Sequence, residues 1–455
     1  MNIIRYINKL MFVLVVSPMF SCESFLDERP DKSLVVPSTL EDFQTLLDNE
    51  VGVMNHGPAL GLISSDEYYT SYQGWQGFIT AIERNGYIWK KEIYEGFGGA
   101  DWKVPYESVF YSNIVLEGLE KVTINEENQA WWNRLRGSAL FYRSFAFYGL
   151  LDIYAPVYDP SSAATDWGIP IRLTADVNAP VFRESVDNGY RQIIEDLEEA
   201  SNLLPERPDY LTRPSATACD ALLARVYLVM GDYEQALQAA ERSLGKMNDL
   251  IDYNLLDETA ARPITGENVE VIFRNRMVSY SFANSPLVYV DPNIIGLYHE
   301  NDLRKDIFFE KRGEGKYSFR GTYTGDLGLF SGLTTAELLL VKAECEVRAG
   351  KIIKANEALN QLLEKRYREG SFFPLDIQEE DDLLDQVFAE RRKELVFRGS
   401  RWTDLRRLNK SGDLSETLTR ELDGQVYTLP PNDPRYVLPI PPEEINVADI
   451  PQNPR

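Results

Sequence analysis

Apolar residues recur at spacings of three and four along several long stretches of the chain, with polar residues between them. The pattern is clear around Ile193 and Leu197. It is typical of an amphipathic helix, because 3.6 residues complete one helical turn. It predicts helices over residues 103–121, 128–154, 187–204 and 215–245. Ser38 and Glu41 predict a capping box that opens a further helix running to Leu47.

The last of these stretches carries a repeat-like pattern. Its sequence, SATACDALLARVYLVMGDYEQALQAAERSL, breaks at Gly231 between two helical runs. Its residues match the positions of a tetratricopeptide repeat: Leu223, Ala224, Tyr227, Gly231, Tyr233, Ala236 and Ala240. A weaker copy spans residues 336–368, with Ala343, Gly350, Ala355 and Leu359 in matching positions. Since such repeats bury their faces against neighbours, we predict a mostly α fold with several helix pairs stacked side by side.

Two long stretches, residues 51–100 and 246–333, lack a sustained helical period and are rich in Gly, Tyr, Asn and Pro. Loops of this length are uncommon unless they are functional, so we expect irregular, ligand-facing insertions with minor β structure. Near the C-terminus, the Asp-Gly pair at Asp423 predicts a hairpin turn. The prolines of the YVLPIPPEEI segment that follows favour an edge strand or extended chain.

The N-terminus combines positive charge, a short apolar run and a cysteine. Arg5 and Lys9 precede the run from Leu10 to Val16, and Cys22 follows it. The run is shorter than the roughly 20 apolar residues of a transmembrane helix, so it predicts a cleaved signal. A cysteine at the cleavage point predicts a bacterial lipoprotein with lipid attached there. The alternative is a plain secretory signal with an incidental cysteine.

Composition excludes one class of partner and argues against several kinds of site. Lys and Arg total 47 against 71 Asp and Glu, a net charge of -24, so most of the surface would repel nucleic acid. His56 and His299 are the only histidines of the sequence, too few for a metal cluster, and they argue against a histidine-activated nucleophile. Cys219 and Cys345 are predicted to be buried free thiols. We expect no cofactor and no metal site.

Aromatic residues concentrate between Asp66 and Tyr111, where 13 of 46 residues are aromatic. Part of this set is assigned to the core, and Tyr87 with Trp89 alternates like a short strand. In YYTSYQGWQGF, by contrast, glycines and polar residues interleave the rings. Exposed rings beside amides suit sugars, because pyranose faces stack on Trp and Tyr while amides bond the hydroxyls.

The candidate ligand-binding residues are therefore aromatic. They are Tyr68, Tyr69, Tyr72, Trp75, Trp102 and Tyr280. The second insertion offers similar candidates with weaker support, namely Tyr289, Tyr298, Tyr317 and Tyr323. The alternative interpretation is that Trp75 covers a local core.

A basic segment, Phe388 to Leu408, stands out on this acidic chain, with seven Lys and Arg against three acids. Its apolar residues can share one face, and its arginines are predicted to pair with acidic repeat helices, which is a structural role. Paired carboxylates could also form a glycosidase centre. With 71 acids in the chain no pair stands out, so no catalytic residue is predicted.

Several segments resemble the SusD/RagB family, the surface lipoproteins of nutrient-uptake systems in Bacteroidota. The resemblance extends over nearly the whole chain. It is carried by CESFLDERP after the lipid cysteine, ALFYRSFAFYGLLDIYAPV at residues 139–157, ALLARVYLVMGDYEQAL at 221–237, ERRKELVFRGSRWTDLRRL at 390–408 and YVLPIPPEEI near the end. The last two segments are the most specific.

Membership implies a SusD-like fold with four tetratricopeptide-like helix pairs and a ligand-facing portion built from the insertions. It also implies a partner, since family members lie as a lid on a SusC-like, TonB-dependent outer-membrane transporter. They capture oligosaccharides or other nutrients and hand them over without catalysis. The acidic residues after Cys22 resemble the export signal of surface lipoproteins, which implies an outer-membrane protein facing the exterior.

The sequence therefore predicts a non-catalytic, lipid-anchored protein that captures glycans for a transporter. Two alternatives remain open: an envelope-anchored, carboxylate-dependent glycoside hydrolase, and a tetratricopeptide-type scaffold or peptide-binding lipoprotein. The predicted organisation is a signal peptide over residues 1–21, a tether over 22–37, an N-terminal region over 38–245 with the insertion 51–100, and a C-terminal region over 246–455 with the insertion 246–333, the repeat pair 336–368 and a tail.

Overall fold

Helices dominate the regular structure in residues 37–96 and 98–455, the part of the chain that the computed structural model describes. The predicted signal peptide and Cys22 lie outside these residues. Thr39–Arg455 form one compact unit. Its α-helices are α2 (Leu40–Leu47), α3 (Leu60–Ser64), α4 (Tyr72–Gln76), α5 (Ala81–Tyr87), α6 (Ala100–Leu119), α7 (Gln129–Tyr154), α8 (Val186–Leu203), α9 (Ala216–Met230), α10 (Tyr233–Lys246), α11 (Pro292–Ile295), α12 (Arg304–Phe308), α13 (Thr335–Arg348), α14 (Ile352–Leu363), α15 (Glu380–Glu394), α16 (Ser400–Ser411) and α17 (Pro442–Ala448).

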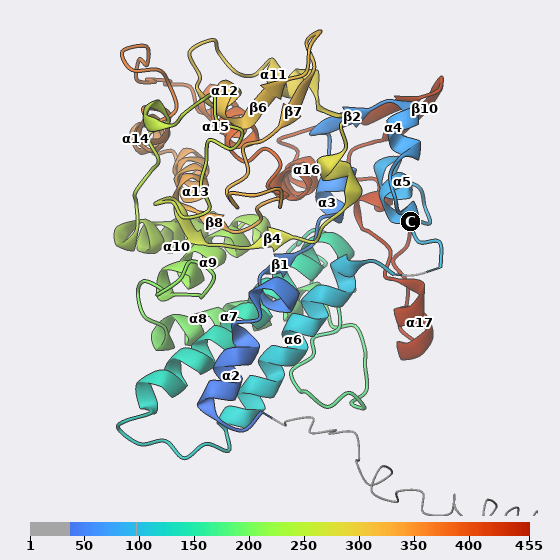
Figure 1. Cartoon of the computed structure of the whole chain (residues 1–455), viewed down its shortest axis with the longest axis vertical. Helices are drawn as coiled ribbons and strands as arrows, with labels where there is room; N and C mark the ends of the chain where they lie inside the picture. Colours follow the sequence, from blue (N-terminus) through green and yellow to red (C-terminus); the bar gives the residue numbers. More distant parts are fainter. Residues whose placement is uncertain (1–36, 97) are drawn as a thin grey trace, which may run out of the picture. The chain divides into compact units, whose positions relative to one another are not determined.

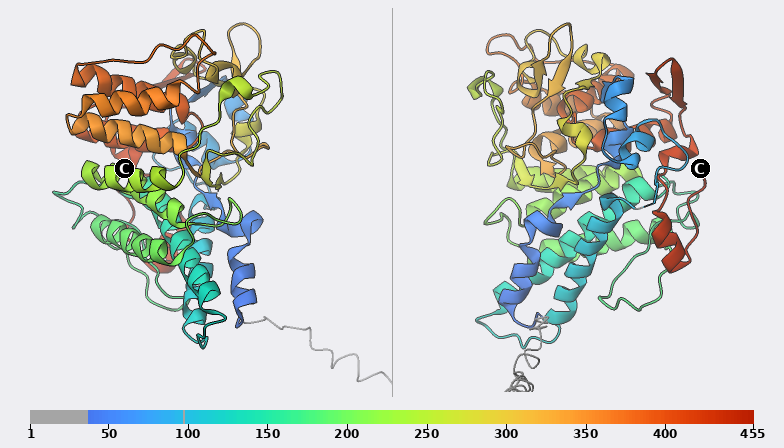
Figure 2. Two further views of the ribbon diagram at one scale, coloured as in Figure 1. Left: turned by 90° about the vertical axis from the view of Figure 1, so that its left-hand side faces the viewer. Right: turned by 45° about the vertical axis from the view of Figure 1, so that its right-hand side comes forward.

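The long helices pack against one another in chain order (Figures 1 and 2). Helix α6 contacts α7, α7 contacts α8, and the row continues through α9, α10 and α13 to α14 and α15. Helix α2 packs against both α6 and α7 at the start of the row. The predicted stack of helices is confirmed. In the described residues, no helix combines the length and the apolar character needed to cross a membrane.

Two helix–turn–helix pairs match the predicted repeats. Helix α9 ends at Met230 and is followed by Gly231, whose φ of 76° lies in the left-handed region that favours glycine, and α10 begins two residues after Gly231. Gly350, with a φ of 70°, makes the same kind of turn between α13 and α14. Ala224, Ala236 and Ala240 are fully buried between the paired helices. Their small side chains let the helix backbones approach closely.

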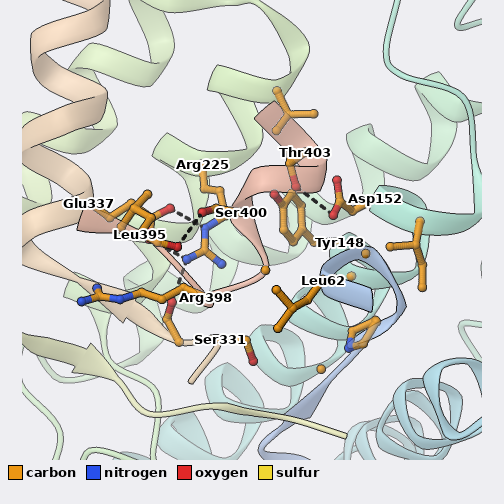
Figure 3. Close-up of a pocket in the computed structure, with 18 of the residues that line it drawn as sticks. Leu62, Tyr148, Asp152, Arg225, Ser331, Glu337, Leu395, Arg398, Ser400 and Thr403 are labelled. Atoms are coloured by element: carbon orange, nitrogen blue, oxygen red, sulfur yellow. Dashed lines mark hydrogen bonds and ion pairs between the residues drawn. The ribbon is translucent and has the colours of Figure 1, made fainter. Parts of the chain in front are cut away.

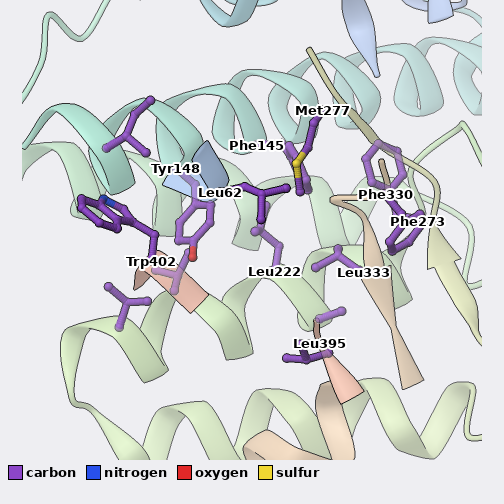
Figure 4. Close-up of a cluster of buried hydrophobic side chains, with 14 of the residues drawn as sticks. Leu62, Phe145, Tyr148, Leu222, Phe273, Met277, Phe330, Leu333, Leu395 and Trp402 are labelled. Atoms are coloured by element: carbon purple, nitrogen blue, oxygen red, sulfur yellow. The ribbon is translucent and has the colours of Figure 1, made fainter. Parts of the chain in front are cut away.

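A buried apolar cluster joins the helix row to the C-terminal helices (Figure 4). Trp402 of α16 is fully buried, and Figure 4 shows it next to Tyr148 of α7 and Leu62 of α3. Gly61 makes room for this packing, because a Cβ there would lie 3.1 Å from the Trp402 Cβ. Full burial of one large apolar side chain contributes about 1.5–3 kcal/mol. The cluster therefore holds the first insertion, through α3, against the C-terminal part of the chain.

Strand structure is minor, as predicted, and the described residues form two-stranded pairs. β1 (His56–Gly57) pairs parallel with β4 (Arg276–Met277). The antiparallel pairs are β2 (Tyr68–Thr70) with β5 (Val288–Val290), β3 (Val271–Phe273) with β8 (Leu333–Thr334), β6 (Phe309–Lys311) with β7 (Tyr317–Phe319), and β9 (Leu418–Leu422) with β10 (Gln425–Leu429). The β9–β10 hairpin turns at Asp423, which confirms the predicted turn.

The start of the first helix differs from the prediction by one residue. Thr39, not Ser38, is the N-cap of α2, and its Oγ1 accepts a hydrogen bond from the Asp42 amide at 3.2 Å. The Asp42 carboxylate accepts from the Thr39 amide in return. Both Ser38 and Thr39 are followed by an acid three residues later, so the local sequence does not choose between them.

Two further local predictions are wrong. Tyr87 and Trp89 form no strand, because Tyr87 ends α5 and Trp89 has a φ of 52°. The YVLPIPPEEI segment is not extended throughout, since Pro442 is the first residue of helix α17, a position where proline costs no hydrogen bond. The prediction of buried free thiols is confirmed for Cys219 and Cys345.

The basic segment 388–408 has the predicted structural role. The Arg407 guanidinium binds the Glu344 carboxylate of α13 through both Nη atoms, at 2.6 and 2.8 Å. Arg401 binds Asp66 in the same two-pronged way, at 2.8 Å for each contact. The second pair ties the first insertion to α16, because Asp66 lies two residues before β2.

Candidate functional site

The two insertions meet in the antiparallel pair of β2 and β5. Tyr69 lies directly opposite Tyr289 in this pair. The residues on either side of both tyrosines are buried, and alternate residues of a strand point to opposite faces, so the two rings point outward together. Their centroids are 5.7 Å apart. We call this half-exposed aromatic pair the tyrosine platform.

Helix α4 places two more aromatic residues immediately after β2. Ser71 caps the helix by accepting a hydrogen bond from the Gly74 amide at 3.1 Å. The rings of Tyr72 and Trp75 then lie 5.6 Å apart, and Tyr72 is 41% exposed. The Trp75 Nε1 donates to the Arg84 carbonyl oxygen at 2.8 Å, which fixes the indole. Both glutamines of α4 are exposed, so amides lie beside the rings.

Replacing Gly74 with alanine is expected to lower the free energy of unfolding by about 1–3 kcal/mol. A Cβ at Gly74 would lie 2.1 Å from the Thr70 Oγ1 and 2.9 Å from the Leu287 Cβ, so α4 could not keep its place against β2 and β5. Urea unfolding followed by circular dichroism measures the change. Gly245→Ala is the control, because nothing lies within 4 Å of the added Cβ in α10. Equal stabilities of Gly74→Ala and wild type would contradict the expectation.

The structure divides the six predicted binding residues into two groups. Tyr69, Tyr72 and Trp75 keep accessible ring surface on the platform and α4. Tyr68 is 2% exposed, and its hydroxyl donates to the Ile63 carbonyl oxygen at 3.0 Å. The other two buried residues are Trp102 at 4% and Tyr280 at 9% exposure.

Tyr280 and Trp102 are held by neighbours inside the protein. The Tyr280 hydroxyl donates to the Asp101 carboxylate, whose other oxygen accepts from two backbone amides of the α3 N-terminus. Trp102 packs edge-on against Tyr154, with ring centroids 5.0 Å apart. Tyr289 is one of the weaker candidates that the sequence predicts. The alternation of Val288, Tyr289 and Val290 is the signal that could have raised it, because it marks one outward residue between two buried ones.

A groove of about 640 Å³ lies between α6, residues 170–181 and α17. Trp102 and Tyr106 contribute to its wall, with ring centroids 4.7 Å apart. Val447 of α17 lines it as well and is 87% exposed. Small-molecule sites commonly have volumes of about 300–1,000 Å³, so the groove is within that range.

A smaller cavity of about 80 Å³ has charged groups of α7, α9, α13 and α16 in its lining (Figure 3). Arg225 binds the Glu337 carboxylate at 2.6 and 2.7 Å, and the Thr403 hydroxyl donates to Asp152 at 2.9 Å. The carboxylates of this cavity are thus engaged by a guanidinium and a hydroxyl. In residues 37–96 and 98–455, no group of three or more His, Cys, Asp or Glu residues could hold a metal ion.

A buried carboxyl group precedes β2 and connects it to β7. Glu67 is 1% exposed, and its Oε1 accepts a hydrogen bond from the Phe397 amide at 2.8 Å. Burial raises the pKa of Glu67 to about 7, against the opposing effect of the Phe397 hydrogen bond. The Phe397 ring stacks on Phe319 of β7, with centroids 4.6 Å apart. Glu67 therefore links the start of β2 to β7 through Phe397.

Replacing Glu67 with glutamine is expected to remove a loss of stability between about pH 4.5 and 7. The folded wild type keeps the Glu67 proton up to about pH 7, whereas the unfolded chain releases it near 4.5, so stability falls as pH rises through this window. Glutamine keeps an acceptor for the Phe397 amide. The free energy of unfolding of the variant, measured relative to that of wild type, should therefore be about 1–3 kcal/mol higher at pH 8 than at pH 4.5. Urea titrations at both pH values test this, and parallel pH dependence of the two proteins would contradict it.

Two family models match large parts of the chain. A model described as "Starch-binding associating with outer membrane" matches residues 24–228, and a model described as "SusD family" matches residues 335–455. The first match contains the insertion 51–100, and the insertion 246–333 lies between the two matches. The chain belongs to the SusD/RagB family.

Relatives of this SusD-family protein match it over nearly their full lengths. SusD-like protein P2 of Formosa agariphila is 24% identical, and the alignment covers 98% of this chain and 99% of the relative. A putative sugar binding protein of Bacteroides vulgatus superposes with a TM-score of 0.72 at 21% identity, over 92% of this chain and 98% of that structure. A SusD superfamily protein of Bacteroides thetaiotaomicron superposes with a TM-score of 0.72 at 20% identity, over 92% of this chain and 100% of that structure. These structures confirm the predicted mostly α, SusD-like fold.

Proposed function

We propose that this SusD-family protein captures oligosaccharides at the cell surface and delivers them, uncleaved, to a TonB-dependent outer-membrane transporter. The observation that carries the proposal is the tyrosine platform, where Tyr69 and Tyr289 turn their rings outward from paired strands. Flat aromatic faces stack on the apolar faces of pyranose rings. Tyr72 and the exposed amides of α4 continue this surface, and they supply hydrogen-bonding groups for sugar hydroxyls.

Three further observations support the proposal. The matching family model is described as starch-binding and associated with the outer membrane, and the similar structure from Bacteroides vulgatus is called a putative sugar binding protein. Cys22 supplies a lipidation point ahead of the compact unit. Lipid attached there would anchor the protein to the outer membrane, and the acidic residues that follow favour the exterior face. A SusC-like transporter is the partner that family membership implies.

A glycan panel tests this function directly. Protein comprising residues 23–455 is run through native gels that contain one polysaccharide each, from neutral and acidic classes, with bovine serum albumin as the non-binding control. Retardation on at least one polysaccharide is expected. Each incubation is also assayed for new reducing ends. Reducing ends would replace the capture proposal with a hydrolase, and migration unchanged on every polysaccharide would leave a peptide-binding or scaffold role.

A further inference from the structure

A small notch adjoins the tyrosine platform between β5 and β7. It encloses about 70 Å³ and is lined by the β5 residues, part of β7 and the segments around Ser285 and Asp326. Figure 1 shows β7 near β2 at the end of the unit away from α2. A water molecule needs roughly 10–15 Å³ of such space, so the notch can hold a carboxylate or sulfate group but no pyranose ring. A substituent of a sugar stacked on the platform could enter it.

Two arginines of the notch carry charge that no acidic side chain neutralises at close range. Arg320 donates from its Nη atoms to the carbonyl oxygens of Ala260, Glu258 and Asp306, at 2.9, 2.6 and 2.5 Å. Its Nε is buried without a hydrogen-bond partner. In the described part of the chain, Arg262 donates only to the Asp326 carbonyl oxygen, at 3.4 Å. Within residues 37–96 and 98–455, neither guanidinium forms an ion pair with a carboxylate.

The acids near the notch are already engaged. The Asp326 carboxylate binds Arg276 at 2.6 Å and accepts from the Gly328 amide at 2.7 Å. Asp257 lies close enough to Arg320 to feel its charge, but it does not line the notch, and its carboxylate accepts from the amide and hydroxyl of Thr259 at 2.9 and 2.6 Å. The charged residues that line the notch are Arg262, Arg320 and Asp326, and Asp326 is paired with Arg276, so the lining is net positive on a chain whose overall charge is -24.

A third cation lies over the platform itself. The Lys316 Nζ is 5.2 Å from the centroid of the Tyr289 ring. Among the described residues, Lys316 forms no ion pair with a carboxylate. An ammonium held against a tyrosine face by cation–π attraction keeps its hydrogen-bond donors available to a ligand. Lys316, Arg262 and Arg320 thus present positive charge on the β5 side of the stacking surface.

We propose that the captured glycan is anionic, with its sugar ring stacked on Tyr69 and Tyr289 and its carboxylate or sulfate directed to Arg262, Arg320 and Lys316. This inference rests on the proposed glycan-capture function. Guanidinium and ammonium groups make charge-assisted hydrogen bonds to such oxyanions, and these bonds are stronger than those to neutral hydroxyls. Overall repulsion by the acidic protein is screened beyond about 8 Å at physiological salt, so the local charges decide binding.

Calorimetric titrations with oligosaccharides of three classes test the inference: neutral gluco- and xylo-oligosaccharides, oligouronates and sulfated oligogalactans. Residues 23–455 should bind one acidic class at least tenfold more tightly than the neutral ones, and this preference should shrink as NaCl increases. The acidic class that binds distinguishes carboxylate from sulfate recognition. Arg262→Gln and Lys316→Gln should each weaken acidic binding at least fivefold. Lys354→Gln, on the exposed face of α14, is the matched control and should leave binding unchanged.

The outcomes separate the inference from the function on which it rests. Equal or tighter binding of neutral oligosaccharides, with Arg262→Gln and Lys316→Gln both at wild-type affinity, would overturn the anionic preference and leave glycan capture intact. Failure to bind any class would overturn glycan capture and the inference with it. Lys316 is near the surface, so its variant keeps the test valid even if Arg262→Gln fails to fold.

Discussion

Replacing Glu394 with alanine is expected to lower the free energy of unfolding by about 3–5 kcal/mol. The carboxylate is fully buried and is shared by two buried guanidinium groups. Arg366 donates to it from Nε and Nη2, both at 3.0 Å, and Arg304 donates at 3.2 Å. Removing it leaves two buried cations short of a counter-charge, which is the costly way to break an internal ion pair.

Urea unfolding at pH 7 measures this loss, with Glu357→Ala as the control. Glu357 is exposed on α14, so its replacement should change stability by no more than about 0.5 kcal/mol. Burial opposes ionisation of Glu394, but the two arginines outweigh it and lower its pKa to about 2. The contribution of this carboxylate to the free energy of unfolding should therefore decrease as pH falls from about 4.5 towards 2. If the free energy of unfolding of Glu394→Ala lay within 1 kcal/mol of the wild-type value, the ion pairs of Glu394 with Arg304 and Arg366 would contribute little to stability.

Removing both rings of the tyrosine platform is expected to weaken glycan binding by about 5- to 150-fold. Each aromatic contact contributes about 0.5–1.5 kcal/mol beyond its buried area, so the Tyr69→Ala/Tyr289→Ala double variant should lose about 1–3 kcal/mol of binding free energy. Both rings point outward from their strands, so the variant should stay folded. Calorimetry with the oligosaccharide found by the panel measures the change.

Tyr210→Ala is the matched control for that experiment. Tyr210 is a 63% exposed tyrosine outside β2, β5 and α4, so its removal should leave glycan affinity unchanged. A double variant that binds as tightly as wild type would move the site away from the platform. The groove that Trp102 and Val447 line would then be the next site to test by substitution.

The helical part of the fold could be predicted because its determinants are local. Ile193 and Leu197 repeat at helical spacing and are fully buried in α8. Gly231 marks the turn between α9 and α10 because only a residue without Cβ takes its conformation without strain. The basic segment could be assigned a structural role because an acidic chain offers many partners for its arginines.

The candidate site could be predicted only in part, because its geometry depends on contacts that are remote in sequence. β2 and β5 are joined, for example, by the hydrogen bond from the Thr70 hydroxyl to the Leu287 carbonyl oxygen, 217 residues apart. Local composition indicated the aromatic segment but not which rings turn outward. Tyr68 and Tyr69 are adjacent and chemically identical, yet the strand buries one and exposes the other. Trp89 was assigned to a strand because alternation alone does not reveal a left-handed backbone.

Capture at the tyrosine platform is tested by a calorimetric titration of residues 23–455 with the oligosaccharide that the panel identifies, followed by chromatography of the recovered ligand. We expect saturable binding, an affinity reduced about 5- to 150-fold in the Tyr69→Ala/Tyr289→Ala variant, and a ligand of unchanged length. Shortened ligand, or equal affinity of the two proteins, would contradict capture at the tyrosine platform.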